Sequence, residues 1–212
     1  MIASDALDRR SHWEAVYLEK DEPQLSWHQD DPALSLELVS KLCPEGGAVL
    51  DVGGGTSLLA SRLAARGREV TVLDLSGAAL RRAQERSGPA GGRVRWVVGD
   101  VCGPSWQASG PFDVWHDRAV FHFLADPEDR RTYALRVRES VRPGGHVVVA
   151  TFAPDGPERC SGLPVQRYDA DALASELAPG LTLVASRREV HTTPWGSQQA
   201  FTYAVLRREG GQ

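Results

Sequence analysis

Short apolar runs alternate with amphipathic segments along most of this chain. The runs are strand-like because each is brief, apolar and bounded by turn residues, whereas the segments between them have helical spacing and helix-end signals. The strand-like runs are Ala48–Val52, Glu69–Asp74, Arg93–Val101, Phe112–Trp115 and His146–Phe152. This alternation predicts an α/β fold with a mostly parallel sheet and helices on both faces.

The helical segments carry recognisable start and stop signals. Ser76 is a suitable N-cap, and Pro127 stands at the first position of a helix that Asp126 would cap. The predicted helices are Leu58–Arg66, Ala78–Arg86, the segment from Asp126 to the Arg142–Gly145 stop, and Asp169–Ala178. The last two apolar runs, Leu181–Val190 and Gln199–Leu206, flank a short loop and predict a closing β-hairpin.

The first strand ends in an acid and a glycine turn, Asp51 and Gly53–Gly55. Glycine has no Cβ, so a ligand can approach the backbone closely and the turn can adopt positive φ angles. A dinucleotide fingerprint needs a third glycine at the position that Leu58 occupies. A carboxylate at Asp51 would repel a phosphate, so the turn favours a cationic ligand.

Two further strands also end in an acid. Asp74 lies 23 residues after Asp51 and ends the second run, at a distance that suits an acid binding a ribose diol. Asp100 lies at the end of the third run. A solvated turn residue explains any one of these acids, but three at successive strand ends predict a shared binding site.

Composition predicts one domain over residues 1–212. Apolar residues make up 42% and charged residues 25% of the chain, and no apolar run approaches the roughly 20 residues of a membrane span. The net charge of -4 disfavours a nucleic-acid partner. The first ten residues are charged and lack the apolar core of a secretory signal, so a cytoplasmic location is expected.

The cysteine and histidine content predicts no metal site. Cys43, Cys102 and Cys160 are odd in number and far apart, which excludes a disulfide framework and a zinc-binding C-x-x-C pair. The six histidines form no H-E-x-x-H motif. A serine hydrolase is also excluded, because the chain has no G-x-S-x-G elbow.

The acid-x-Gly-x-Gly turn that follows the first strand resembles motif I of the class I S-adenosylmethionine-dependent methyltransferases. This resemblance implies S-adenosylmethionine as cofactor, S-adenosylhomocysteine as product, and an acid at the third strand end that meets the adenine amino group. It also implies a Rossmann-like sheet of seven strands in the order 3-2-1-4-5-7-6, with the last strand antiparallel. The implied cofactor-binding residues are Trp27, Asp51, Gly53, Gly54, Gly55, Thr56, Asp74, Leu75, Gly99, Asp100, Val101 and Asp117.

The layout of the whole chain is similar to that of the thiopurine S-methyltransferase family. The matching motifs are Trp13–Tyr17, Trp27-His28-Gln29, Asp117-Arg118-Ala119, Asp129–Tyr133 and His191–Gly196. Two features depart from that family's pattern: His116 stands between Trp115 and Asp117, and an insert occupies Cys160–Pro164. The resemblance implies a small-molecule acceptor for the methyl group.

Residues 1–44 are expected to form a helical extension ahead of a catalytic core at residues 45–212. Its aromatic residues, Trp13, Tyr17 and Trp27, have two interpretations. They staple the extension onto the sheet, because tryptophan buries well, or they form a lid over cofactor and acceptor, where an aromatic face favours a sulfonium cation. Both interpretations can hold for different residues.

Methyl transfer from a sulfonium is an in-line displacement, which depends mainly on aligning the acceptor with the methyl group. A thiol, another chalcogen or an oxygen acceptor must lose a proton, and His116, Asp117 and His122 are the candidate bases, with a structural role as the alternative for His122 and a cofactor-lining role for His116. Arg118 is predicted to hold the acceptor, with a buried ion pair to Asp117 or Asp129 as the alternative. The predicted catalytic residues are His116, Asp117 and Arg118, and the predicted acceptor contacts are Trp13, His28, Arg118, His122, His191 and Trp195.

Two other functions remain open at this stage. A protein lysine methyltransferase would present an open, acidic groove to its protein substrate. A non-catalytic module would bind the cofactor and regulate a partner, although the presence of Asp51, Asp74 and Asp100 together favours retained cofactor binding.

Overall fold

Seven strands form one mixed sheet in the computed structural model, which describes residues 2–104, 106 and 110–210. The spatial order is β3-β2-β1-β4-β5-β9-β8. β1 to β5 run parallel, and β9 lies antiparallel between β5 and β8. The strands are β1 (Ala48–Val52), β2 (Glu69–Asp74), β3 (Val94–Val98), β4 (Phe112–Arg118), β5 (Val141–Phe152), β8 (Leu181–Thr192) and β9 (Gln198–Arg208). The predicted fold class and strand order are confirmed.

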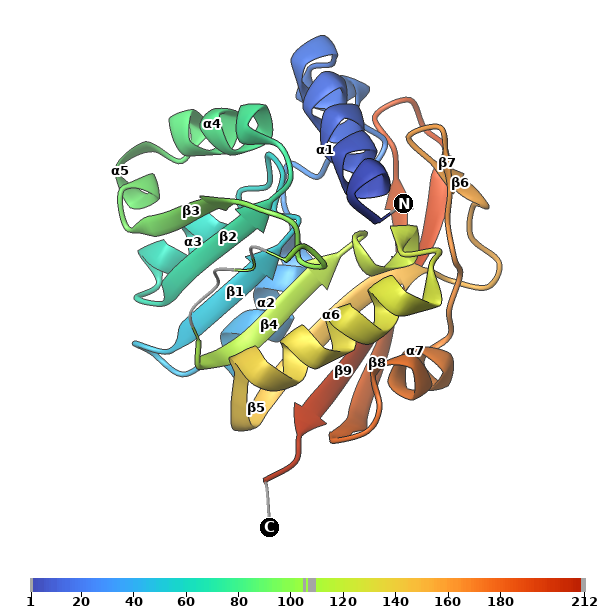
Figure 1. Cartoon of the computed structure of the whole chain (residues 1–212). Helices are drawn as coiled ribbons and strands as arrows, with labels where there is room; N and C mark the ends of the chain where they lie inside the picture. The colour runs from blue at the N-terminus through green and yellow to red at the C-terminus, as the bar shows by residue number, and fades with distance from the viewer. Residues whose placement is uncertain (1, 105, 107–109, 211–212) are drawn as a thin grey trace.

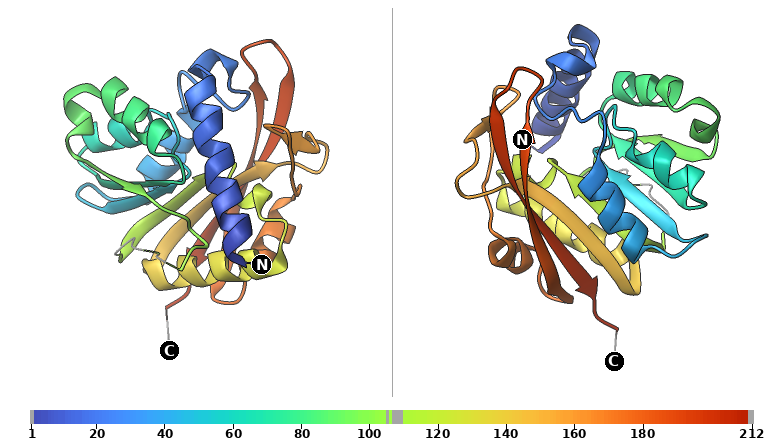
Figure 2. Two further views of the ribbon diagram at one scale, coloured as in Figure 1. Left: turned by 45° about the horizontal axis from the view of Figure 1, so that its top comes forward. Right: turned by 180° about the vertical axis from the view of Figure 1, so that it is seen from behind.

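Helices cover both faces of this sheet (Figures 1 and 2). α2 (Ala33–Leu42) and α3 (Leu59–Ala65) pack on one face, and α6 (Pro127–Ser140) and α7 (Ala170–Leu177) pack on the other. The remaining elements are α1 (Ile2–Glu19), η1 (Glu22–Gln24), α4 (Gly77–Arg86), α5 (Gly88–Gly91), η2 (Phe121–Phe123) and a small hairpin of β6 (Arg159–Cys160) with β7 (Leu163–Pro164). The unfamiliar insert at Cys160–Pro164 is part of this hairpin.

The central strands are buried on both sides, as expected for a parallel sheet between two helical layers. Successive side chains of a strand point to opposite faces. In β4, Val114 therefore joins the cluster beneath α2 and α3, whereas Trp115 joins the cluster beneath α6 and α7. The same alternation decides where the polar residues of β4 point.

The helix caps predicted from sequence are present. The side chain of Ser76 accepts a hydrogen bond from the Ala79 N–H, and that of Asp126 accepts one from the Glu128 N–H. Two boundaries were wrong. β5 begins at Val141 and not at His146, so the predicted helix stop at Arg142–Gly145 lies within a strand. β4 continues past Trp115 to Arg118, because its pairing with β1 and β5 continues through His116 and Asp117. Those polar residues concealed the last part of the strand.

Helix α1 lies across the carboxyl ends of the parallel strands (Figures 1 and 2). Its Glu14 accepts hydrogen bonds from the Ser76 hydroxyl at 2.7 Å and from the Ala78 N–H at 3.2 Å, at the start of α4. Near the C-terminal end of α1, the Lys20 carbonyl accepts a hydrogen bond from Arg82. These contacts fix the extension over the edge of the sheet where parallel α/β folds bind ligands. Within the described residues, no helix has the length and apolarity needed to cross a membrane.

Candidate cofactor and acceptor site

Two adjoining pockets open at the carboxyl edge of the sheet. The large pocket, about 780 Å³ and open to solvent, lies between α1 and the ends of β1, β2 and β3. Of the residues predicted from sequence, it is lined by Trp13, Trp27, Gly53, Asp74, Leu75, Gly99, Asp100, Val101 and Arg118. The second, which we call the glycine-loop pocket, is lined by Trp27, His28, Asp51, Gly53, Gly54, Gly55, Thr56, His116 and Arg118.

The glycine loop has no space for side chains. Gly53 and Gly55 have φ angles of +66° and +52°, in the left-handed region that glycine adopts readily. A Cβ at Gly53 would overlap a methyl group of Val120, and one at Gly55 would overlap the hydroxyl of Tyr17. The loop is therefore a cradle in which a ligand can lie directly against the backbone.

Asp74 lies at the floor of the large pocket and also holds the glycine loop. Its two carboxylate oxygens accept the Gly55 N–H at 2.9 Å and the Ser76 N–H at 2.8 Å. Burial raises the pKa of Asp74 to about 6, although the two backbone hydrogen bonds oppose the shift. Each oxygen keeps a second lone pair with which it can accept a ribose hydroxyl.

Asp100 offers an unused acceptor to the large pocket. Its Oδ1 accepts the Cys102 N–H at 2.8 Å. Its Oδ2 is buried without a hydrogen-bond partner, although the guanidinium of Arg9 lies 3.5 Å away. An unpaired buried oxygen is costly, so this atom suits a donor such as the adenine amino group.

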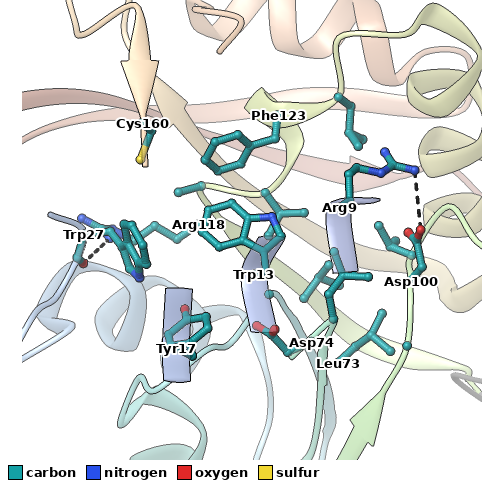
Figure 3. Close-up of a pocket in the computed structure, with 18 residues that line it drawn as sticks. Arg9, Trp13, Tyr17, Trp27, Leu73, Asp74, Asp100, Arg118, Phe123 and Cys160 are labelled. Atoms are coloured by element: carbon teal, nitrogen blue, oxygen red, sulfur yellow. Dashed lines mark hydrogen bonds and ion pairs between the residues drawn. The ribbon is translucent and has the colours of Figure 1, made fainter. Parts of the chain in front are cut away.

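Aromatic rings from the N-terminal extension close the large pocket (Figure 3). The ring of Trp13 packs edge-on against Trp27 and Phe123, with centroids 5.6 Å and 5.0 Å apart, and Tyr17 packs against Trp27 at 6.1 Å. These rings pack on one another and also line the pocket. The two interpretations of the extension, staple and lid, are therefore compatible with the same residues.

Asp51 is held by a histidine on the neighbouring strand. Its Oδ1 lies 2.7 Å from Nδ1 of His116, and Nε2 of His116 lies 2.9 Å from the hydroxyl of Ser35 in α2. Asp51 and His116 are each only 3% exposed. Both nitrogens of the imidazole are thus engaged, which argues against the predicted role of His116 as a base for the acceptor.

Arg118 lies between the two pockets and is paired, although not with the predicted partners. Its guanidinium donates to the Trp27 carbonyl at 3.1 Å and to the Tyr203 hydroxyl at 3.2 Å, and lies 3.5 Å from the carboxylate of Glu189. It also lies over the ring of Phe201, 4.3 Å from the centroid. An ion pair is present, as in the alternative interpretation of Arg118, but its partner is Glu189 of β8 and not Asp117 or Asp129.

Asp117 points away from both pockets, toward α6. Its carboxylate accepts hydrogen bonds from the Tyr133 hydroxyl at 2.7 Å, the Val120 N–H at 2.8 Å and the Phe121 N–H at 3.0 Å. Burial raises its pKa to about 6. Because strand residues alternate, Asp117 faces the opposite side of the sheet from His116 and Arg118, so the structure argues against the predicted catalytic and cofactor-binding roles.

Three predicted acceptor contacts also lie outside both pockets. His122 is fully buried and accepts the Phe152 N–H, whereas His191 is paired with the Ser26 carbonyl at 2.8 Å. Trp195 is 58% exposed in the loop between β8 and β9. These placements favour the structural alternative for His122 and argue against acceptor contacts by all three.

The burial of His122 predicts a measurable pH dependence of stability. Burial lowers the pKa of His122 to about 3 in the folded chain, whereas in the unfolded chain the imidazole has the ordinary pKa of about 6.5. Between these two pH values the unfolded chain binds a proton that the folded chain does not bind. Stability from this residue is present above the ordinary pKa and is lost as the pH falls. Between pH 7.5 and 4.5 the wild type should lose about 2–3 kcal/mol more unfolding free energy than His122→Gln. Urea denaturation at both pH values measures the difference, and equal losses in the two proteins would contradict it.

Several residues of the pocket were not in the predicted set. Arg9, Phe123 and Cys160 all line the large pocket. Arg9 bridges Asp100 and Asp129, a contact across 120 residues that no local pattern announces. Cys160 lies in the Cys160–Pro164 insert. The departure of this insert from the family's pattern was the feature of the sequence that could have identified Cys160 as a pocket residue. Among the described residues, no cluster of three or more His, Cys, Asp or Glu side chains could hold a metal ion.

Comparison with known proteins agrees with this geometry. Residues 49–145, which include the glycine loop and all three strand-end acids, match the family model of a methyltransferase domain. The family match and the curated relatives support a class I S-adenosylmethionine-dependent methyltransferase. The match does not bear on the thiopurine S-methyltransferase branch, which stays a prediction for this chain.

Curated relatives of this methyltransferase match over part of their length. An uncharacterized methyltransferase of Mycobacterium tuberculosis is 41% identical over 104 residues, which are 49% of this chain and 50% of the relative. A ubiquinone biosynthesis O-methyltransferase of Xanthomonas axonopodis is 33% identical over 134 residues, 62% of this chain and 54% of the relative. The chain thus spans about half the length of the curated relatives that it matches.

Solved structures share the fold across nearly the whole methyltransferase. One, from work on the conversion of a disulfide bond into a thioacetal group during echinomycin biosynthesis, has a TM-score of 0.77 and 23% identity, and the match covers 96% of this chain and 94% of that one. The N-methyltransferase NodS from Bradyrhizobium japonicum, in complex with S-adenosylhomocysteine, has a TM-score of 0.72 and 18% identity, covering 95% and 99%. At these identities the likeness supports the fold alone.

Proposed function

We propose that this chain transfers a methyl group from S-adenosylmethionine to a small-molecule acceptor bound in the large pocket. The observation that carries the proposal is the arrangement at the carboxyl edge of the sheet. A glycine loop without room for side chains lies between the acids Asp51 and Asp74, and Asp100, one of whose oxygens has no hydrogen-bond partner, lines the adjoining large pocket.

The strand-end acids would hold different parts of the cofactor. Asp100 would accept the adenine amino group, Asp74 would accept the ribose hydroxyls, and Asp51 would face the positively charged methionine end. When bound, S-adenosylmethionine supplies an electrophilic methyl group on a sulfonium. The aromatic rings of Trp13, Trp27 and Phe123 would exclude water from that end of the pocket and favour the cation.

The same walls favour a flat, aromatic acceptor. Arg118 is neutralised by Glu189, and Arg9 by Asp100 and Asp129, so the described cations that line the pocket are already paired. Burial raises the pKa of the Cys160 thiol to about 11, so it stays protonated. An acceptor that ionises in solution, such as a thiol or an acidic phenol, would need no base from the pocket.

A lysine methyltransferase is less well supported. It would need an open, acidic groove, whereas the pocket next to Trp13 and Trp27 is aromatic and its acids lie where the cofactor would bind. The names of the ubiquinone biosynthesis O-methyltransferases say that these relatives take part in making a small molecule. Those names support a small acceptor here without specifying it.

Formation of S-adenosylhomocysteine tests the proposal. We would incubate the purified protein with S-adenosylmethionine and a panel of aromatic thiols, phenols, aliphatic thiols, selenide, carboxylates and lysate proteins. Turnover with an aromatic thiol or an acidic phenol is the expected result. Labelling of protein alone would favour lysine methylation, and tight binding of S-adenosylhomocysteine without turnover on any acceptor would favour the regulatory module.

A further inference from the structure

His116 contacts the acid that the cofactor's methionine end would meet. Asp51 and His116 are directly opposite in the register of the parallel strands β1 and β4, so both side chains lie on the face covered by α2. Oδ1 of Asp51 lies 2.7 Å from His116, while its Oδ2 lies beside Gly54, where a Cβ would come within 3.0 Å of it. One carboxylate oxygen is thus held by the histidine and the other faces the glycine loop.

We propose that His116 is a positioning residue whose protonation state sets how much negative charge Asp51 presents to the ammonium group of the cofactor's methionine moiety. The inference rests on the proposed function, because it assigns a role to the cofactor-binding end of that same site. It replaces the earlier interpretation of His116 as a base for the acceptor.

The hydrogen bonds of His116 define its two states. A neutral imidazole donates from Nδ1 to Asp51 and accepts at Nε2 from the hydroxyl of Ser35, so the full charge of the carboxylate remains available to a ligand. A protonated imidazole donates from both nitrogens and forms an ion pair with Asp51. The ammonium group then meets a pair without net charge, and its binding weakens.

The other charged groups around His116 are paired or remote from this contact. On the same face, the hairpin of β8 and β9 contributes Glu189 and Tyr203, and β4 contributes Arg118, which pairs with Glu189. Burial raises the pKa of Tyr203, so that hydroxyl stays protonated. Asp117 precedes Arg118 but faces α6. His28, bonded to Asp30, is the second imidazole that lines the glycine-loop pocket.

Two ligands separate the methionine end from the rest of the cofactor. S-adenosylhomocysteine carries the amino-acid tail, whereas 5′-methylthioadenosine shares the adenine, ribose and sulfur but lacks the tail. We would measure both dissociation constants by calorimetry at intervals between about pH 5.5 and pH 8. Asp74 titrates in this range, with a pKa of about 6, but it faces the ribose that both ligands share, so the ratio of the two constants cancels its effect.

The preference for S-adenosylhomocysteine over 5′-methylthioadenosine should rise roughly tenfold as the pH increases across this range. In His116→Gln, whose amide can donate to Asp51 at every pH, the preference should not change with pH. His28→Gln is the matched control and should keep the wild-type rise. If protonated His28 bound the tail carboxylate instead, the preference would fall as the pH rises.

A preference that stays flat or falls with pH in the wild type would overturn the inference while leaving the proposed function intact, because both ligands still bind. A rise that persists in His116→Gln would also overturn it. Failure of S-adenosylhomocysteine to bind at any pH would overturn the inference and the proposed function together. Should His116→Gln fail to fold, Ser35→Ala replaces it: loss of the Ser35 hydroxyl should shift the pH at which the preference rises.

Discussion

Replacement of Gly53 by alanine is expected to lower methyl transfer roughly 100-fold while the chain still folds, because a displacement of about 1 Å at a reacting centre has an effect of that size. Gly53 has a φ of +66°, and its added methyl group would overlap Cγ2 of Val120. Val120 is held by the hydrogen bond from its N–H to Asp117, so the glycine loop is the part that must move. A turnover assay measures the loss of methyl transfer, and titration with S-adenosylhomocysteine measures the loss of cofactor affinity.

Gly88→Ala is the matched control for this substitution. Gly88 also has a positive φ, +56°, but nothing lies within 4 Å of the position a Cβ would take. Both variants therefore carry the cost of a left-handed alanine, about 1–2 kcal/mol, and only Gly53→Ala displaces the loop. Equal losses of cofactor affinity in the two variants, or unchanged affinity in Gly53→Ala, would contradict this account of the loop.

The positions of the three strand-end acids followed from the sequence because they depend on local rules. Asp51, Asp74 and Asp100 each end an apolar run, and the carboxyl ends of parallel strands meet at one edge of a sheet. The structure places all three acids at the two adjoining pockets. The glycine loop could also be predicted from local sequence, because an acid and three glycines between a strand and a helix are typical of a ligand-binding turn.

The acceptor side could not be derived in this way. The apolar pattern predicts that the fourth strand ends at Trp115, so the alternation of strand residues is not expected to include the polar residues that follow. With the strand extended to Arg118, alternation places His116 and Arg118 on one face and Asp117 on the other. The misplaced strand end therefore led to the prediction of one catalytic group, His116, Asp117 and Arg118, although these side chains lie on two faces of the sheet.

Long-range pairing accounts for the other differences. The partner of Arg118 is Glu189, 71 residues later, and it reaches the site because β8 pairs with β9, which in turn pairs with β5. Arg9 and Asp129 are 120 residues apart and meet because α1 crosses the edge of the sheet. A partly buried charge needs a partner, but the local sequence does not show which residue that partner is. Such pairs can be identified only once the fold is known.

The position of Asp117 predicts a large loss of stability on Asp117→Ala. The substitution leaves three donors without a partner: the buried Tyr133 hydroxyl, the buried Phe121 N–H and the part-buried Val120 N–H. Each of the two buried donors costs about 1–3 kcal/mol and the part-buried one less, so the free energy of unfolding should fall by about 3–5 kcal/mol.

Tyr133→Phe separates this structural role from a catalytic one. It removes one of the three donors to Asp117 and also the acceptor of the Trp115 indole N–H, whereas the N–H groups of Val120 and Phe121 keep their acceptor. It should therefore cost about 2–3 kcal/mol. Urea denaturation at pH 7.5 gives both values. If Asp117 were the base for the acceptor, Asp117→Ala would keep near wild-type stability and lose turnover. Stability that falls in the order wild type, Tyr133→Phe, Asp117→Ala instead identifies a carboxylate that holds the turn against which the glycine loop packs.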